Sequence, residues 1–173
     1  MGPLDAHIGL AYESRTLRDS APRRHENFQG GSMTAYDPSN IFAKILRGEI
    51  PCHRVYEDEH TIAFMDVMPQ APGHTLVVPK APSRNLLDAD TATLARLLPA
   101  VQKIALAAKS AFQADGITIM QFNEPAGGQT VFHLHIHVIP RHTDVPLRKH
   151  AGQMEDPQVL AAHAEKIKAA LQA

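Results

Sequence analysis

The sequence predicts an α+β fold, a five-stranded antiparallel sheet with a long helix packed on one face. The side chains of residues 131–139 follow the strict period of two by which a β-strand places successive residues on opposite faces. Four other short β-prone segments precede them, and residues 91–113 repeat apolar side chains at three- and four-residue steps, as a helix does. The 173 residues, 44% of them hydrophobic, suit one domain with a packed core.

Residues 1–32 differ in character from the rest of the chain. They are polar, show no sustained apolar period, contain Pro3 and Pro22, and are followed by a second methionine, Met33. Residues 26–30 resemble a protease-cleavage linker, so we interpret the segment as a disordered leader derived from an expression vector. A natural disordered extension and a misplaced start codon are the alternatives. The folded domain is therefore expected over residues 33–173.

The domain is predicted to open with a short helix that starts at residues 37–39 and ends at Gly48. Two strands are expected next, at residues 53–57 and 61–66, on either side of a charged turn. Asp66 ends the second strand, at a place where a carboxylate can project over a binding site.

A stiff loop and the long helix follow. The loop 68–73 contains two prolines and a glycine and is expected to form a pocket wall, and His74 begins the third strand. Asp90 is a suitable N-cap for the helix at residues 91–113. Pro99 lies inside that helix and is expected to kink it or split it.

The remaining elements surround a glycine-rich loop. A strand is predicted at residues 117–123, ending at Asn123, and the loop 123–130 connects it to the alternating strand. A terminal helix is predicted over about residues 157–171, after an aspartate and a proline that favour a helix start. The polar stretch 142–154 carries no pattern that predicts a function.

The alternating strand carries a row of histidines on one face. His133, His135 and His137 project to the same side, with neighbours about 6.5–7 Å apart. Buried imidazoles cost free energy unless each nitrogen finds a partner, so the row indicates chemistry. Three interpretations are open: solvated histidines on an exposed face, a metal site, and nucleophilic catalysis. The opposite face is apolar and belongs on a core, with Phe132, Leu134, Ile136 and Val138.

Three ordered motifs resemble those of the histidine-triad (HIT) family of nucleotide hydrolases and transferases. Residues 133–139 match its pattern of histidines alternating with apolar residues, and residues 123–130 resemble its phosphate loop. Residues 64–80 resemble the nucleoside-binding segment of the histidine-triad nucleotide-binding branch, of bacterial type, whose members act as purine nucleoside phosphoramidases. The resemblance covers about residues 37–141.

The resemblance implies a role for each site residue. His135 would be the nucleophile, and a backbone carbonyl near His133 would fix its tautomer. His137 would stabilise phosphoryl charge, and His74 would orient the triad. The implied catalytic residues are His135, His133, His137 and His74. The implied nucleotide-binding residues are Asp66, Val67, Asn123, Gly128, Gln129, Thr130, His135 and His137.

The implied activity is hydrolysis of purine nucleoside phosphoramidates, such as AMP-amines or AMP-lysine, through a nucleotidyl-histidine intermediate. The alternatives are a dinucleoside polyphosphate hydrolase and a nucleotide-binding regulatory module with incidental hydrolysis. We expect no cofactor. We expect no structural zinc, because Asn40 and Ala43 occupy the places where many members of the resembled family have zinc-binding cysteines, and no catalytic Mg²⁺, because no carboxylate lies on the triad strand. Zinc shared by two of the triad histidines is the competing possibility.

The expected partners are a purine nucleotide such as AMP or GMP and, by resemblance, a second copy of the chain that extends the sheet to ten strands. The net charge of −1 does not favour nucleic acid as a partner. No run reaches the roughly 18 apolar residues of a membrane span. Cys52 is the single cysteine, which excludes an intrachain disulfide and fits a cytoplasmic protein.

Overall fold

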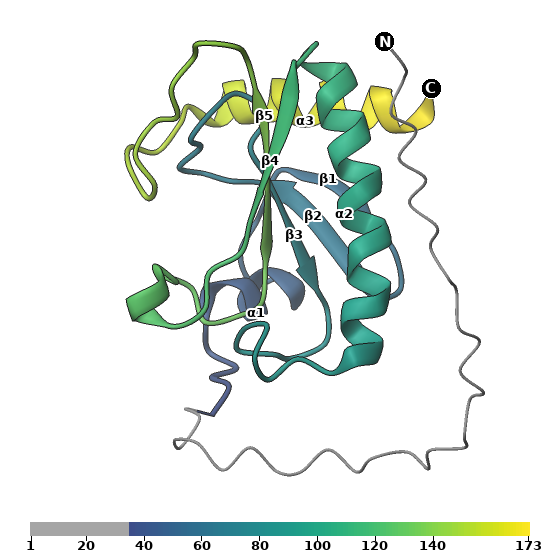
Figure 1. Ribbon diagram of the computed structural model, residues 1–173. Coiled ribbons are helices and arrows are strands. Elements are labelled where there is room, and N and C mark those ends of the chain that lie inside the picture. The colour runs from purple at the N-terminus through teal and green to yellow at the C-terminus, as the bar shows by residue number, and fades with distance from the viewer. Residues whose placement is uncertain (1–34) are drawn as a thin grey trace, which may run out of the picture. The chain divides into compact units, whose positions relative to one another are not determined.

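The computed structural model describes residues 35–173, so the predicted leader, residues 1–32, lies outside the described part. A five-stranded sheet with the strand order β1-β2-β3-β5-β4 forms the centre of the fold, and every adjacent pair is antiparallel (Figure 1). Its strands are β1 (Arg54–Glu57), β2 (Thr61–Met65), β3 (Thr75–Pro79), β4 (Gly116–Met120) and β5 (Ile136–Arg141). The predicted α+β class and the five-stranded antiparallel sheet are confirmed.

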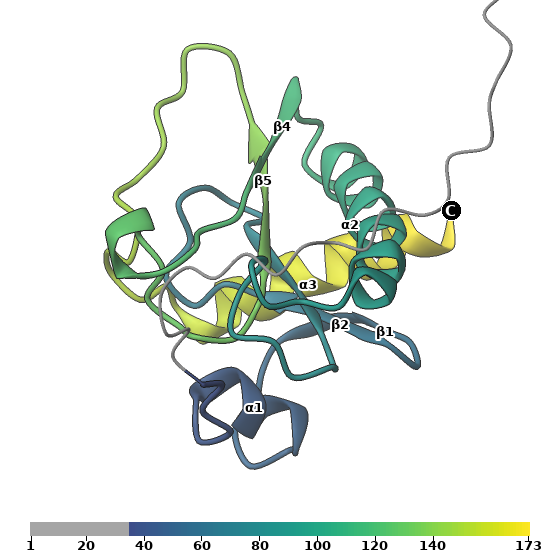
Figure 2. The same cartoon turned by 60° about the horizontal axis from the view of Figure 1, so that its bottom comes forward.

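Helices cover both faces of the sheet (Figure 2). The long helix α2 (Thr91–Ala111) and the terminal helix α3 (Pro157–Gln172) pack together on one face. The short helix α1 (Ile41–Leu46) packs on the other. Because both faces are covered, every residue of β2 and β3 is buried, and these strands have nearly continuous apolar sequences. No helix in residues 35–173 combines the length and hydrophobicity needed to cross a membrane.

Side-chain caps fix the starts of the helices. The Asn40 side chain accepts a hydrogen bond from Ala43 N–H and begins α1, one residue beyond the predicted start. Asn40 and Ala43, which replace the zinc-binding cysteines of the resemblance, thus form a helix cap. Gly48 follows α1 at φ +75°, a left-handed conformation that favours glycine. Asp156 caps α3 at Gln158 N–H, as the sequence predicted.

The helix α2 is not split at Pro99, contrary to one of the expectations. It runs as a single helix from Thr91 to Ala111, and Pro99 lies on its exposed side. The carbonyl of Ala95, which loses its partner because proline has no N–H, is on an exposed residue where water can replace the lost hydrogen bond.

The alternating segment is only partly a regular strand. β5 begins at Ile136 rather than Val131 and extends to Arg141, because β3 pairs with it only from Ile136 onward. Before that point the backbone turns to a loop, where Leu134 N–H donates to the Ser83 carbonyl (2.8 Å). The predicted alternation of faces nevertheless holds, since Leu134 is buried in the core beneath α2. Likewise, β4 ends at Met120, so Asn123 lies three residues past the strand that it was predicted to end.

Candidate active site

The predicted histidine face lines a cavity with two chemically different ends. One end is apolar and lies between α1 and the sheet; it includes Ile41, Phe42, Ile45, Ile50, Phe64 and Leu76. The other end is polar and includes Asp66, Thr130, His135, His137 and His150. An apolar slot beside a group of hydrogen-bonding side chains suits a ligand that joins an aromatic ring to a polar group.

A backbone carbonyl fixes the tautomer of His135. Its Nδ1 lies 2.6 Å from the carbonyl oxygen of His133, which can only accept a hydrogen bond. Nδ1 therefore carries the proton, and Nε2 keeps its lone pair. The ring is 6% exposed and packs edge-on against Phe42 at 5.0 Å between centroids, which restricts its rotation. His135 is thus held as a neutral imidazole with a nucleophilic nitrogen.

His133 has both ring nitrogens occupied within the fold. Nε2 donates to the Pro79 carbonyl (2.9 Å), so Nδ1 is an acceptor, and the Tyr36 hydroxyl donates to it (2.6 Å). The ring is fully buried. His133 therefore contributes to the site through its carbonyl, which orients His135, rather than through a free nitrogen.

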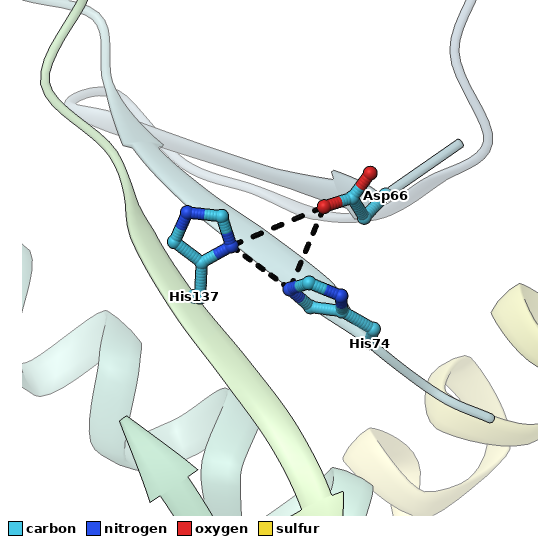
Figure 3. A group of neighbouring side chains, drawn as sticks. All are labelled: Asp66, His74 and His137. Carbon is cyan, nitrogen blue, oxygen red and sulfur yellow. Dashed lines mark hydrogen bonds and ion pairs between the residues drawn. The ribbon is translucent and has the colours of Figure 1, made fainter. Parts of the chain in front are cut away.

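A chain of hydrogen bonds fixes His74 and His137 (Figure 3). The backbone N–H of Gln70 donates to His74 Nδ1 (3.1 Å), which places the proton of His74 on Nε2. That Nε2–H donates to His137 Nδ1 (2.9 Å). The Asp66 carboxylate lies 3.5 Å from His74 Nε2. His137 must then carry its proton on Nε2. This Nε2–H is buried without a partner in the described residues, on a side chain that lines the cavity.

Burial keeps these imidazoles neutral. It lowers the pKa of His74 from 6.5 to about 4, although the Asp66 carboxylate acts in the opposite direction. Burial, followed by the neighbouring His135, His74 and His150, lowers the pKa of His137 to about 2. The pKa of His135 is also lowered by burial. Near neutral pH, His135 therefore keeps its lone pair without needing a base to remove a proton.

Asp66, His74 and His137 place three potential metal-binding atoms within 4.8 Å of one another. Their nearest oxygen and nitrogen atoms are 2.9, 3.5 and 3.9 Å apart, close to the roughly 3.3 Å that tetrahedral zinc imposes on its ligands. The tautomers do not fit, however. Gln70 N–H occupies the lone pair of His74 Nδ1, so His74 Nε2 is protonated and cannot bind a cation. A metal here would require that hydrogen bond to break.

The predicted phosphate loop is largely hydrogen-bonded within itself. The loop contains a short 3-10 turn, η1 (Pro125–Gly127), in which Gly127 N–H and Gln129 N–H donate to the Glu124 carbonyl and Gly128 N–H to Pro125. These amides were expected to face a phosphate, and in this arrangement they are already used. Of the four residues from Gly127 to Thr130, it is Thr130 that lines the cavity.

Two predicted nucleotide contacts point elsewhere through their side chains. The side-chain Oδ1 of Asn123 accepts from Leu86 N–H (3.0 Å). The Gln129 amide is buried and donates to the carbonyls of Arg84 and Val131. The contacts predicted for Asn123, Gly128 and Gln129 stay predictions, and the structure gives the two side chains a role in holding the loop.

Asp66 and Val67 lie at the cavity, where they were expected. One oxygen of Asp66 accepts from Met68 N–H (2.9 Å), and the other faces His74. His74 is fully buried behind His137, so it acts on a ligand through its neighbour. The structure thus brings the triad, His74 and Asp66 together, while their roles toward a ligand stay predictions.

Three residues at this site are not indicated by any sequence pattern. His150 comes from the polar stretch 142–154 and lies 5.6 Å, between ring centroids, from His137. Phe122 packs edge-on against His137 at 5.4 Å. Tyr36 reaches His133 from before the first helix. A single histidine, phenylalanine or tyrosine in irregular chain has no periodic signal, so only the path of the chain reveals these contacts.

Comparisons with known proteins agree with this geometry. The HIT domain model matches residues 47–144. Protein hit of Bacillus subtilis is 42% identical over 102 residues, covering 59% of this chain and 70% of that protein. A crystal structure of a Hit-like protein involved in cell-cycle regulation from Bartonella henselae, with an unknown ligand, is 62% identical with a TM-score of 0.75, covering 79% of this chain and 99% of that one.

A crystal structure of a Zn-bound histidine triad family protein from Mycobacterium smegmatis is 36% identical with a TM-score of 0.69, covering 78% of this chain and 94% of that one. Its zinc belongs to that protein, and this chain has Asn40 and Ala43 at the positions where the resemblance has cysteines. The match to the family model and the similarity to these relatives establish the family: the chain belongs to the HIT family.

Proposed function

We propose that this protein hydrolyses purine nucleoside phosphoramidates, compounds in which AMP is joined to an amine, without a metal ion. Membership of the HIT family gives the coarser class, a nucleotide-binding hydrolase. The observation that carries the finer proposal is the His135 ring, whose proton is held on Nδ1 by the His133 carbonyl so that Nε2 is free to attack phosphorus.

In the first step, His135 Nε2 forms a bond to the α-phosphorus while the bond from phosphorus to the leaving group breaks. The His137 Nε2–H, buried and without a partner in the described residues, would donate to a phosphoryl oxygen as its charge grows. Such a donor is effective because it is already oriented, through His74, by the backbone N–H of Gln70. In the second step, water displaces His135 from phosphorus and releases AMP.

The two ends of the cavity support a nucleoside as the group that is transferred. At the apolar end, Phe42 and Phe64 pack edge-on against each other (5.5 Å between ring centroids) and, with Ile41 and Leu76, offer an apolar wall for a base. Asp66 lies at the polar end, and its carboxylate, which accepts from Met68 N–H, has further lone pairs that can accept hydrogen bonds from ribose hydroxyls. Base recognition through apolar contact supports a preference for the larger purines, since they bury more surface.

Independence from metal is part of the proposal. It is supported by the tautomer of His74, which leaves the cluster of Asp66, His74 and His137 without the lone pair that a cation needs. The charge of the phosphoryl group would instead be met by the His137 Nε2–H and by the polar residue Thr130.

The test is hydrolysis of adenosine 5′-phosphoramidate by the purified protein in EDTA, beside diadenosine tetraphosphate. We expect fast release of AMP from the phosphoramidate, unaffected by EDTA and reduced at least about 1,000-fold in His135→Ala, because the nucleophile is lost. The matched control is His142→Ala, an exposed histidine that follows the last sheet strand, which should keep full activity.

Each other outcome has a defined meaning. Activity confined to the dinucleotide would move the protein to the polyphosphate hydrolases. Nucleotide binding without turnover of either compound would support a binding module. Turnover lost in EDTA and restored by zinc would show that the chemistry uses a metal.

A further inference from the structure

We propose that His150 is the general acid of this site, which protonates the leaving amine as its bond to phosphorus breaks; the inference rests on the proposed phosphoramidate hydrolysis. His150 lies in the polar stretch after β5, which no motif of the sequence explains. It lines the same cavity as His135 and His137.

Two aromatic rings of the site contact His150, and they also contact each other. The ring centroid is 5.1 Å from that of Phe122 and 5.6 Å from that of His137. The charge of His150 also contributes to the lowered pKa of His74, His135 and His137, behind burial in each case, which reflects how close it lies to the buried imidazoles.

The segment that carries His150 is bound to the loop after β2. Arg148 N–H donates to the Gln70 carbonyl (2.9 Å), and the Gln70 side-chain amide donates to the Arg148 carbonyl (3.1 Å). Further along, Glu155 N–H donates to the Val67 carbonyl (2.9 Å). Gln70 is the residue that fixes the tautomer of His74, so the same side of the cavity holds both the hydrogen-bond chain and His150.

The leaving group needs a proton that the buried histidines cannot supply. An amine expelled as an anion is a very poor leaving group, so protonation must accompany cleavage. His137 Nε2–H is the proton of a neutral imidazole, and its loss would leave an anion. His74 cannot replace that proton, because the hydrogen-bond chain that runs through His74 ends at the backbone N–H of Gln70, which is not an acid. His135 directs its remaining N–H to a carbonyl.

His150 is free of these constraints. It is partly exposed, and its ring nitrogens make no hydrogen bond to any of residues 35–173, so no partner forces a neutral tautomer. The titratable groups around it are His137 and His135 on the triad strand, Asp66 after β2, and Lys149 beside it in the chain. A protonated imidazole here would lie at the polar end of the cavity, on a partly exposed side chain.

His150 gives up one proton in the first step and regains one in the second, so the two steps balance. In the first step the bond from His135 Nε2 to phosphorus forms, the bond from phosphorus to the amine nitrogen breaks, and its electron pair stays on the amine. The amine nitrogen takes the proton of His150. In the second step a water oxygen attacks phosphorus, His150 takes a proton from that water, and the electron pair of the broken bond returns to His135.

The experiment compares two substrates that differ in the need for an acid. In AMP-N-ε-lysine the leaving amine requires a proton, whereas in adenosine 5′-phosphosulfate the sulfate leaves as a stable anion. We expect His150→Asn to lower kcat/KM at least about 100-fold for the amine substrate, with the loss in kcat. For the phosphosulfate, kcat/KM should change less than about threefold, because kcat/KM reports the first displacement, in which the sulfate needs no proton. The control is His142→Asn, an exposed change in the same segment.

The phosphosulfate rate also shows that the variant is folded and that its nucleophile is intact. Equal losses on both substrates would assign His150 a structural role, and no loss on either would show that solvent supplies the proton; both results overturn the proposal. Wild-type protein that cleaves the phosphosulfate but not the amine substrate would overturn the proposed function and, with it, the need for an acid.

Discussion

Protonation of single histidine rings is decided by backbone groups in this protein. The His133 carbonyl keeps a proton on His135 Nδ1, and the Pro79 carbonyl keeps one on His133 Nε2. The N–H of Gln70 donates to His74 Nδ1, so that nitrogen stays unprotonated. Four imidazoles of the same chemistry thus acquire different roles. His135 presents a lone pair, whereas His137 presents a proton without a partner in residues 35–173.

The buried histidines make the stability of the fold depend on pH. The pKa of His74 is lowered to about 4, while in the unfolded chain it takes up a proton near 6.5. Between these values the unfolded state binds the proton and the folded state does not. His74 therefore does not lower the free energy of unfolding above about pH 6.5. As the pH drops from 6.5 toward 4, this group lowers the free energy of unfolding by about 1.4 kcal/mol per pH unit. His137 adds a loss of the same sign.

The measurement is the free energy of unfolding by urea from pH 8 to pH 4.5, for the wild type and for His74→Asn. The variant will be less stable at every pH, because Gln70 N–H and His137 lose a partner. Its slope below pH 6.5 should be smaller by about 1.4 kcal/mol per pH unit. Identical slopes would mean that His74 protonates equally in both states and would contradict the lowered pKa of His74 in the fold.

At the scale of elements, the loop between β2 and β3 connects the core to the site. It carries Asp66 at its start and His74 at its end, and Asp66 N–H donates to the His74 carbonyl (3.0 Å) to close it. Gly73 lies at φ +80°, and a Cβ there would come within 2.4 Å of the Phe112 ring at the end of α2. The close approach of the loop to α2 therefore requires a glycine.

Gly73→Ala should destabilise the protein and disturb the site together. The left-handed backbone and the collision with Phe112 together should cost about 2–4 kcal/mol. Activity should fall as well, because His74 is the next residue and orients His137. Thermal unfolding and turnover measure the two effects.

The control is Gly116→Ala at the start of β4, where a Cβ meets nothing within 4 Å and φ is not positive. That variant should melt within about 2 °C of the wild type, since neither strain nor collision is introduced. An unchanged melting temperature in Gly73→Ala would show that Phe112 moves aside and that the loop tolerates a side chain.

The sequence predicts which side chains share a face better than it predicts where strands end. The alternation of residues 131–139 correctly placed Leu134 and Ile136 in the core and the histidines on the other side. It could not show that β3 pairs only from Ile136, because strand ends depend on long-range backbone partners such as the Ser83 carbonyl. For the same reason it could not show that the backbone N–H groups from Gly127 to Gln129, expected to be free, donate to carbonyls within the loop.

At the scale of the whole molecule, the fold class and the triad follow from local patterns, whereas His150 does not. His150 reaches His137 only because the chain after β5 returns along the loop 66–74, through contacts such as Arg148 N–H to the Gln70 carbonyl. Backbone groups of any residue type can make such contacts. A polar segment without a period therefore gives no sign of where it will lie.

The homodimer implied by the family resemblance also belongs to this scale and stays a prediction. β4 is an edge strand with Ile119 47% exposed, and Leu98 and Leu106 of α2 are exposed as well. An uncovered edge with apolar side chains favours pairing with a second copy. Sedimentation should give a dimer for the wild type and a monomer for Ile119→Lys, while Val159→Lys on α3 stays dimeric. A monomeric wild type at micromolar concentration would contradict the ten-stranded sheet.

The central claim is that His135 attacks phosphorus and is then displaced by water. The most direct test uses one diastereomer of an adenosine 5′-phosphorothioamidate, hydrolysed in water enriched in oxygen-18, with the configuration of the product read at phosphorus. Two successive displacements, each inverting phosphorus, predict overall retention. Inversion would mean that water attacks the substrate directly and that the lone pair of His135 serves another purpose.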